Sequence, residues 1–238
     1  MKNAVVCGFV SVALLIGAFP SDSAQAKESK STPKAEDKRL SSASLFPMAL
    51  GSRWVYRVTD KQPGAEEEIS ASVSIVRGVY LLGEQVWYQY EEGDYSLWLR
   101  NDKQGQHEAT ILLDEDANAP KLDRQFLVFK SNPKAGQKWT YRADEEAEEP
   151  TQVECLGTDK QVKVPAGNFR CVVYRITEGE YASTLYFAPG WGLVKYSSKE
   201  IIDGEESTHT EELMKYFPAK KQIKAPIKRG EAKKTTGS

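Results

Sequence analysis

The chain has 238 residues, of which 40% are hydrophobic and 28% are charged, and its formal net charge is −2. This hydrophobic content is enough for a packed core, so the composition excludes a chain that is disordered throughout. The nearly balanced charge does not supply the basic surface that phosphate neutralisation requires, which argues against a nucleic-acid-binding protein.

The first 26 residues have the pattern of an export signal. Lys2 comes before an apolar run from Ala4 to Phe19, and Ala24 and Ala26 form an A-x-A cleavage site. The apolar run is short for a membrane span, which needs about 20 residues. We therefore predict a cleaved signal peptide over residues 1–26 and a periplasmic or extracellular location, with an uncleaved anchor as the alternative.

Two polar segments flank the expected domain. Residues 27–44 are rich in Ser and Lys and nearly free of large apolar side chains, which predicts a flexible leader. Residues 218–238 carry basic side chains between Lys220 and Lys234 against Glu231 alone, which predicts a disordered basic tail. The alternative for this tail is a contact with anionic lipids or acidic polymers of the envelope.

Strand signals dominate between these segments. Short stretches rich in β-branched and aromatic residues alternate apolar with polar positions, as antiparallel strands with one buried face do. Gly, Pro, Asp and Asn separate these stretches at positions typical of turns. The clearest stretches are residues 71–76, 85–90, 95–100, 170–177, 182–187 and 192–197. Residues 119–129 fit either a turn of helix or another strand, and the chain as a whole is predicted to be mainly β and antiparallel.

An internal repeat organises these strands. The sequence W-x-Y-R occurs at 54–57 and again at 139–142, each time after a glycine and a more distant phenylalanine, Phe46 or Phe129. The same shift places V-S-I-V-R-G (73–78) near V-E-C-L-G-T (153–158). We predict two copies of one β-meander unit, over about 45–128 and 129–217, that pack together as a curved sheet, an open barrel or a sandwich.

Within each W-x-Y the two rings are two residues apart, so they share one face of a strand. This spacing predicts that both rings line the core, whereas Arg57 and Arg142 point to the opposite face. An aromatic wall for a sugar or a lipid is the alternative interpretation.

Three cysteines occur, and Cys7 is removed with the signal peptide. Because exported proteins fold in an oxidising compartment, we predict a disulfide between Cys155 and Cys171. The alternative is a pair of buried thiols on neighbouring strands.

Catalytic and metal-binding motifs are not found. His107 and His209 are far apart and fit no zinc spacing, and His209 beside Glu211 and Glu212 is interpreted as a solvated surface residue. The acidic segments 113–118 and 143–149 match no EF-hand and identify no glycosidase pair. The sequence therefore predicts no catalytic residue, no metal site and no cofactor.

Three motifs carry a resemblance to a known group. They are F-P-x(3)-G-x(2)-W-x-Y at 46–56, V-P-A-G-N-F-R-C at 164–171 and A-P-G-W-G-L-V-K at 188–195. Over residues 45–217 the chain resembles exported bacterial proteins of unknown function that include the TapB-like proteins, with a more distant similarity to the curved-sheet lipoprotein carriers of the LolA and LolB type. Trp191 departs from this pattern, which usually has a small aliphatic residue there. The resemblance implies an extracytoplasmic β-protein and supplies no catalytic residues.

We therefore predict a secreted or periplasmic, non-enzymatic β-protein that binds a ligand or partner in the bacterial envelope. One alternative is a carrier of a lipid or other apolar molecule, in a concave sheet lined by Trp87, Trp98, Tyr186 and Phe187. A second alternative is a hydrolase of envelope polymers, which requires two carboxylates of unequal environment in a cleft.

Overall fold

The computed structural model describes most of the expected β domain. The described residues are 45–82, 84–112, 121–144, 147–202, 204–219 and 228–229. The predicted signal peptide, the leader and most of the basic tail lie outside these residues, as does the acidic segment 113–118.

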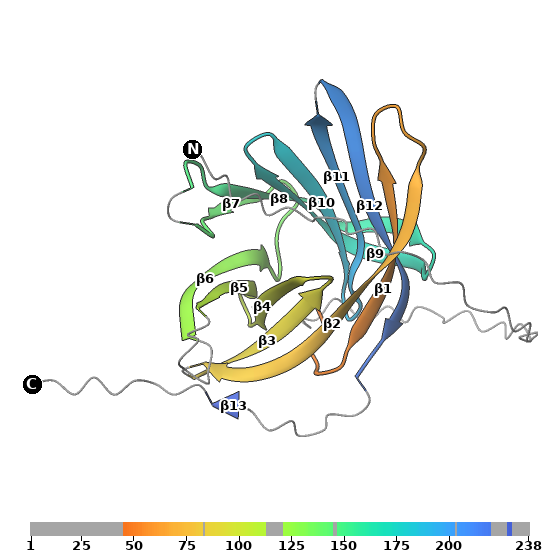
Figure 1. The fold of residues 1–238 in the computed structure, drawn as a ribbon. Helices are drawn as coiled ribbons and strands as arrows, with labels where there is room; N and C mark the ends of the chain where they lie inside the picture. The colour runs from red at the N-terminus through yellow and green to blue at the C-terminus, as the bar shows by residue number, and fades with distance from the viewer. Residues whose placement is uncertain are drawn as a thin grey trace, which may run out of the picture. The chain divides into compact units, whose positions relative to one another are not determined.

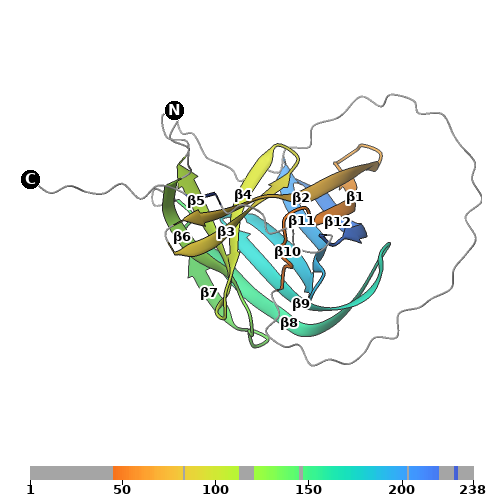
Figure 2. The same cartoon turned by 90° about the horizontal axis from the view of Figure 1, so that it is seen from below.

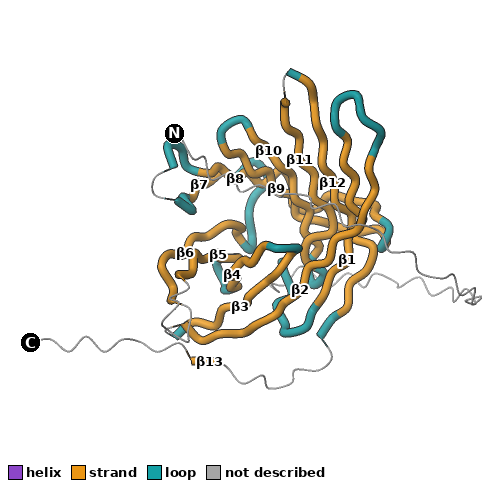
Figure 3. Tube along the Cα trace, in the orientation of Figure 1, coloured by secondary structure: helices purple, strands orange, loops and turns teal. Residues whose placement is uncertain are grey.

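The described residues form one sheet of β-strands and contain no helix (Figure 3). Its hydrogen-bonded order is β6-β5-β4-β3-β2-β1-β12-β11-β10-β9-β8-β7, and every neighbouring pair in this path is antiparallel. This confirms the predicted fold class, and the sheet curls into a nearly closed barrel (Figures 1 and 2).

Two meanders of consecutive strands make up the sheet. The first contains β1 (Arg53–Lys61), β2 (Glu68–Leu82), β3 (Gln85–Glu92), β4 (Tyr95–Asn101), β5 (Gly105–Leu112) and β6 (Lys121–Lys130). The second contains β7 (Lys138–Tyr141), β8 (Thr151–Val164), β9 (Gly167–Glu178), β10 (Tyr181–Ala188), β11 (Gly192–Ile202) and β12 (Glu205–Phe217). A two-residue strand, β13 (Lys228–Arg229), pairs in parallel with Tyr80 and Leu81 of β2. The expected division between residues 128 and 129 lies inside β6, so the first meander ends at Lys130.

The two meanders follow each other head to tail around the barrel, and they meet at two different joints. At the first joint β1 and β12 form a backbone ladder from Arg53 opposite Phe217 to Lys61 opposite Thr208. At the second joint the edge strands β6 and β7 are connected through side chains. Phe126 stacks on Tyr141 with ring centroids 4.9 Å apart, and Trp139 Nε1 donates to the carbonyl of Val128 at 2.9 Å. Aromatic side chains therefore bring together the two edges that β-pairing leaves open.

Equivalent aromatic groups occupy the interior of each meander. In the first, Phe46 and Trp54 pack against each other and against Tyr90, with ring centroids 4.7–6.0 Å apart. In the second, Tyr174 packs against Trp139 at 5.9 Å and against Phe129, at the end of β6 of the first meander, at 4.9 Å. Trp54 and Tyr56 have no exposed surface, so the first W-x-Y lines the core as its spacing predicts. Trp139 and Tyr141 are partly buried against the same core.

A matching irregularity supports the two-unit description. The register of β2 against β3 shifts between Val76 and Gly78, opposite Tyr90, and the register of β8 against β9 shifts between Cys155 and Gly157, opposite Tyr174. The same bulge therefore occurs at the same place in each meander, opposite a buried tyrosine.

The predicted disulfide between Cys155 and Cys171 is not present, and both residues are free, fully buried thiols. The register explains this result, because Cys155 lies opposite Tyr174 on β9, three positions beyond Cys171. Three residues of a strand span roughly 10 Å, whereas a disulfide requires Cα atoms within about 7 Å. The alternative of two buried thiols on neighbouring strands is what the structure contains.

Burial should also make these thiols unreactive, since desolvation raises the pKa of Cys155 and raises that of Cys171 to about 12. We expect the native mature chain (residues 27–238), without reductant, to resist maleimide, and the same chain unfolded in urea to take up two labels. Intact mass measures both. An unfolded chain that takes no label until reductant is added would show that the pair is oxidised.

Candidate functional site

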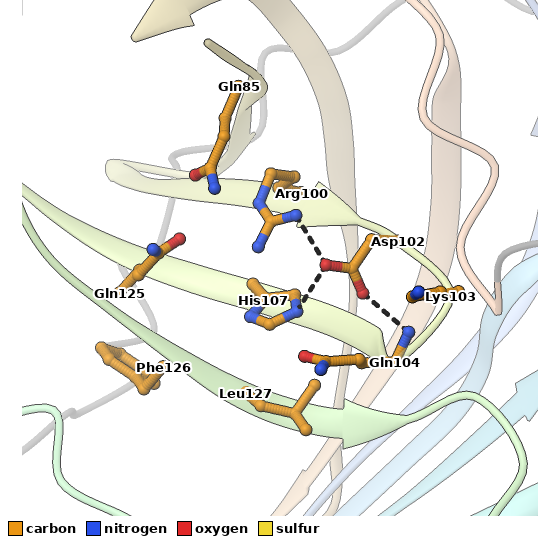
Figure 4. Close-up of a pocket in the computed structure, with 9 residues that line it drawn as sticks. All are labelled: Gln85, Arg100, Asp102, Lys103, Gln104, His107, Gln125, Phe126 and Leu127. Atoms are coloured by element: carbon orange, nitrogen blue, oxygen red, sulfur yellow. Dashed lines mark hydrogen bonds and ion pairs between the residues drawn. The ribbon is translucent and has the colours of Figure 1, made fainter. Parts of the chain in front are cut away.

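A cavity lies on the outer face of the first meander, around the turn between β4 and β5 (Figure 4). It is open and has a volume of about 720 Å³. We call it the turn pocket, and its lining residues are Gln85, Arg100, Asp102, Lys103, Gln104, His107, Gln125, Phe126 and Leu127. Three amides, two cationic side chains, one carboxylate and one imidazole therefore converge on one space.

Asp102 organises the turn. Its Oδ1 accepts the backbone N–H groups of Gln104 at 2.8 Å and of Gly105 at 3.2 Å, while Oδ2 accepts Arg100 Nη1 at 2.7 Å. Burial acts to raise the pKa of Asp102, but these hydrogen bonds outweigh it and lower the pKa to about 2. The carboxylate is therefore ionised at neutral pH, and it fixes the guanidinium of Arg100.

Gly105 is required by the close approach of β6. A Cβ atom at this position would lie 1.8 Å from the carbonyl oxygen of Phe129, so a larger residue would displace the strand. The turn is further held by Ser131, whose N–H donates to the carbonyl of Gln104 at 2.9 Å. The backbone of the turn is thus fixed by the Asp102 side chain and by this hydrogen bond to Ser131.

His107 is buried, and its Nε2 lies 3.1 Å from Asp102 Oδ2. Burial and the neighbouring charge of Arg100 lower the pKa of His107, although Asp102 opposes this effect. The imidazole is therefore neutral at neutral pH and can donate from one nitrogen and accept at the other. Asp102 balances one of the two cations, Arg100 and Lys103, so the pocket carries about one net positive charge.

Buried polar atoms without a hydrogen-bond partner among the described residues gather at this place. They include Gln85 Oε1, Arg100 Nε and, directly beneath Arg100, Trp87 Nε1. The guanidinium carbon of Arg100 lies 5.4 Å from the ring centroid of Trp87. Because an unpaired buried polar group costs about 1–3 kcal/mol, a ligand that pairs with these atoms would recover part of that cost.

The predicted ligand-binding aromatic residues fall into two separate groups. Trp87 and Trp98 belong to a small outer cluster with Leu82 and Ala109, beneath the turn pocket. Phe187 is buried in the main core, where it contacts Phe129, Tyr174 and Phe46, and Tyr186 packs against that core. These four side chains therefore do not line one concave surface.

The equivalent turn of the second meander provides an internal comparison. N-D-K-Q-G at 101–105 links β4 to β5, and A-P-G-W-G at 188–192 links β10 to β11 with the same length. In the second turn, the carbonyl of Trp191 accepts Trp54 Nε1 at 2.6 Å, and the Trp191 ring packs near Phe169 and Tyr216. One copy of the turn therefore serves the packing of the core, and the other presents charged and amide groups.

A second cavity, of about 400 Å³, lies on the β8–β9 hairpin. It is lined by Gln161, Val162, Lys163, Asn168, Phe169 and Arg170. Arg170 is held there by an exposed ion pair with Asp159. The turn pocket differs from it in containing a buried histidine and buried polar atoms without partners.

The interpretation of His209 as a solvated surface residue is wrong. Its side chain is only 19% exposed and lies between Asp60 and Glu211, with Nδ1 2.6 Å from Asp60 Oδ1. The strand β12 places His209 directly opposite Asp60 of β1, which a sequence reading without strand register could not show. Within the described part of the chain, no three His, Cys, Asp or Glu residues are arranged to hold a metal ion.

The sequence reasoning missed Arg100, Asp102 and Gln85 as site residues. A signal was present in R-N-D-K-Q-G-Q-H (100–107), where charged and amide residues surround a turn instead of the Gly, Pro and Trp of the second copy. Gln85 and Gln125 gave no local signal, because only the pairing of β3, β4, β5 and β6 brings them to this turn.

Comparisons with known proteins give only low similarities. No protein-family model matches the chain, and no curated protein matches it. A crystal structure of a predicted exported protein with a YmcC-like fold, from Bacteroides fragilis, shows 14% identity and a TM-score of 0.41 over 74% of this chain and 100% of that one. A predicted lipoprotein from Parabacteroides distasonis shows 13% identity and a TM-score of 0.39 over 74% of this chain and 99% of that one. At TM-scores below 0.5, neither similarity bears on function.

Among the residues that the structure describes, none belongs to a helix long and apolar enough to cross a membrane.

The role of Asp102 leads to a testable stability effect. Since its pKa is lowered from 3.8 to about 2, its ionised form should stabilise the fold by about 2 kcal/mol above the pKa of the unfolded chain. We expect Asp102→Asn to lower the free energy of unfolding by about this amount at pH 7. The difference from the wild type should shrink as the pH falls from about 4 towards 2, because protonation then removes the same charge.

Urea unfolding at several pH values measures this effect. Asp159→Asn is the matched control, since Asp159 also pairs with an arginine but is exposed, where ion pairs contribute little. Equal losses in the two variants, or a loss in Asp102→Asn that does not change with pH, would contradict the assignment.

Proposed function

We propose that this chain is an exported, non-enzymatic β-protein that binds an acidic saccharide of the bacterial envelope in the turn pocket. The observation that carries the proposal is the set of buried, unpartnered polar atoms beneath an amide-rich cavity with one spare positive charge. The export signal in residues 1–26 supports the location.

The mixture of donors and acceptors in the pocket suits hydroxyl groups. The amides of Gln85, Gln104 and Gln125 each offer both a donor and an acceptor, and neutral His107 does the same. A sugar hydroxyl also donates and accepts, so it can pair with either end of an amide. An apolar ligand would leave these groups unpaired, which would cost binding energy.

The net positive charge of the turn pocket favours a ligand with one acidic group. Arg100 Nη1 is taken by Asp102, but Arg100 Nε has no partner among the described residues, and Lys103 is exposed at the rim. A carboxylate on the ligand could therefore accept from Arg100 Nε and lie near Lys103. Uronic acids combine such a carboxylate with several hydroxyls.

A binding role fits this pocket better than hydrolysis does. Hydrolysis of glycosidic bonds commonly uses two carboxyl groups, one of them protonated. The turn pocket contains one carboxylate, Asp102, whose oxygens are already engaged by Arg100 and by two backbone N–H groups. The carrier alternative has less support, because large aromatic side chains fill the interior of the sheet.

Calorimetry with two saccharide probes tests the proposal. We expect the mature chain to bind a galacturonate trisaccharide and to bind a neutral galactose trisaccharide at least tenfold more weakly. Arg100→Gln should reduce the affinity for the galacturonate probe roughly 10- to 100-fold, since a hydrogen bond to a charged group contributes about 1.5–3 kcal/mol. Gln125→Ala should reduce affinity for both probes.

Lys199→Ala is the control for a general charge effect, because Lys199 forms an exposed ion pair with Glu206 on β11–β12. It should leave binding unchanged. Absence of binding to either probe, or an equal loss in Lys199→Ala and Arg100→Gln, would refute the saccharide site.

A further inference from the structure

A second group of polar side chains lies inside the barrel, at the β1–β12 joint. His209 Nδ1 is 2.6 Å from Asp60 Oδ1, and His209 Nε2 is 3.2 Å from Glu211 Oε1. Glu211 is almost completely buried, with 7% of its side chain exposed. The imidazole therefore connects a carboxylate of β1 to a carboxylate of β12.

Glu92 of β3 extends this group. Its Oε1 accepts the hydroxyl of Ser74 at 3.0 Å, and its carboxyl group lies beside that of Glu211. Two ionised carboxylates side by side repel each other and offer only acceptors, so this arrangement favours one proton on the pair. Burial, followed by the charge of Glu211, raises the pKa of Glu92 to about 8, which is consistent with Glu92 as the holder of that proton.

The groups that face the cluster from neighbouring strands are the phenols of Tyr56 on β1, Tyr90 on β3 and Tyr196 on β11, whose ring centroid lies 5.7 Å from that of His209. Burial raises the pKa of each phenol, so all three stay neutral over the physiological range.

The nearest cations lie on the opposite face of the sheet. Arg57 and Lys195 both pair with Glu212, the neighbour of Glu211 on β12. Since successive residues of a strand point to opposite faces, these cations and the interior carboxyl groups are on different sides of the sheet.

We infer that Glu92, Glu211, His209 and Asp60 form a proton-dependent clasp that holds the two meanders together at the β1–β12 joint. Asp60 and Glu92 belong to the first meander, whereas His209 and Glu211 belong to the second. Both carboxyl contacts, Asp60 to His209 and Glu92 to Glu211, therefore cross the joint. The clasp is independent of the turn pocket, which lies on the outer face of the first meander.

The sign of the pH dependence follows from the groups involved. A Glu whose pKa is raised on folding contributes stability that is complete below the ordinary value of about 4.5 and is lost as the pH rises to about 8. His209 acts in the same direction. Burial disfavours its charged form, but the hydrogen bonds to Glu211 and Asp60 outweigh that effect and raise its pKa. The clasp should therefore loosen as the pH rises from acid to mildly alkaline values.

Urea unfolding of the full chain between pH 5 and pH 7.5 tests the clasp. One proton held only in the folded state changes the unfolding equilibrium constant about tenfold per pH unit. We expect Glu92→Gln, whose amide stays neutral, to reduce the pH slope of the wild type by that amount. Burial also raises the pKa of Glu108 to about 7. Glu108 contributes equally to the pH slope of both proteins, so its effect cancels in the comparison.

Glu91→Gln is the matched control, because Glu91 precedes Glu92 on β3 and pairs with Arg77 on the outer face. It should keep the wild-type slope. Carboxyl ¹³C NMR of the wild type gives a second readout that does not depend on the folding of any variant, and the Glu92 resonance should titrate well above the normal range. Equal slopes for the wild type and Glu92→Gln, or a normal Glu92 titration, would overturn the inference.

Discussion

Two equivalent groups of one phenylalanine, one tryptophan and one tyrosine determine what the rest of the molecule can do. Phe46, Trp54 and Tyr90 form one such group, and Phe129, Trp139 and Tyr174 form the other. Phe187 lies between them, with its ring centroid 4.8 Å from Phe129 and 6.3 Å from Phe46. Neither meander can bury these rings alone, so each requires the other, and together they fill the interior. A filled interior leaves the outer face and the turns as the places where a ligand can bind.

Duplication also explains why one turn is free to carry a site. The two meanders need the same strand order and bulges, but the turns after their fourth strands have different tasks. The carbonyl of Trp191 accepts the indole N–H of Trp54, so the second turn is tied to the core. In the first turn, Asp102 and Ser131 hold the backbone. The side chains of Arg100, Lys103 and Gln104 can therefore serve another purpose. We propose that this division between a structural copy and a binding copy is the main functional consequence of the repeat.

Much of the fold was predictable because its signals are local. The spacing of Trp and Tyr by two residues, the turn residues and the echo between the two W-x-Y-R segments each depend on a short stretch of chain. The pairing partners were not predictable in this way. Cys155 and Cys171 suggested a disulfide by compartment and spacing, but the strand register places Cys155 opposite Tyr174, three positions from Cys171. His209 is placed beside Asp60 by the β1–β12 ladder, and Gln85 lines the same pocket as Arg100 only because β3 pairs with β4. Sites assembled from distant strands leave no spacing in the sequence that could reveal them.

The central claim is that the interior is a structural core and that binding takes place outside it, at the β4–β5 turn. Backbone NMR during titration with a galacturonate trisaccharide tests this most directly. The account predicts shift changes confined to residues near Gln85, Arg100, His107 and Gln125, with the amides of Tyr174 and Val194 unaffected. Shift changes centred on those interior positions, with none at the turn, would contradict it.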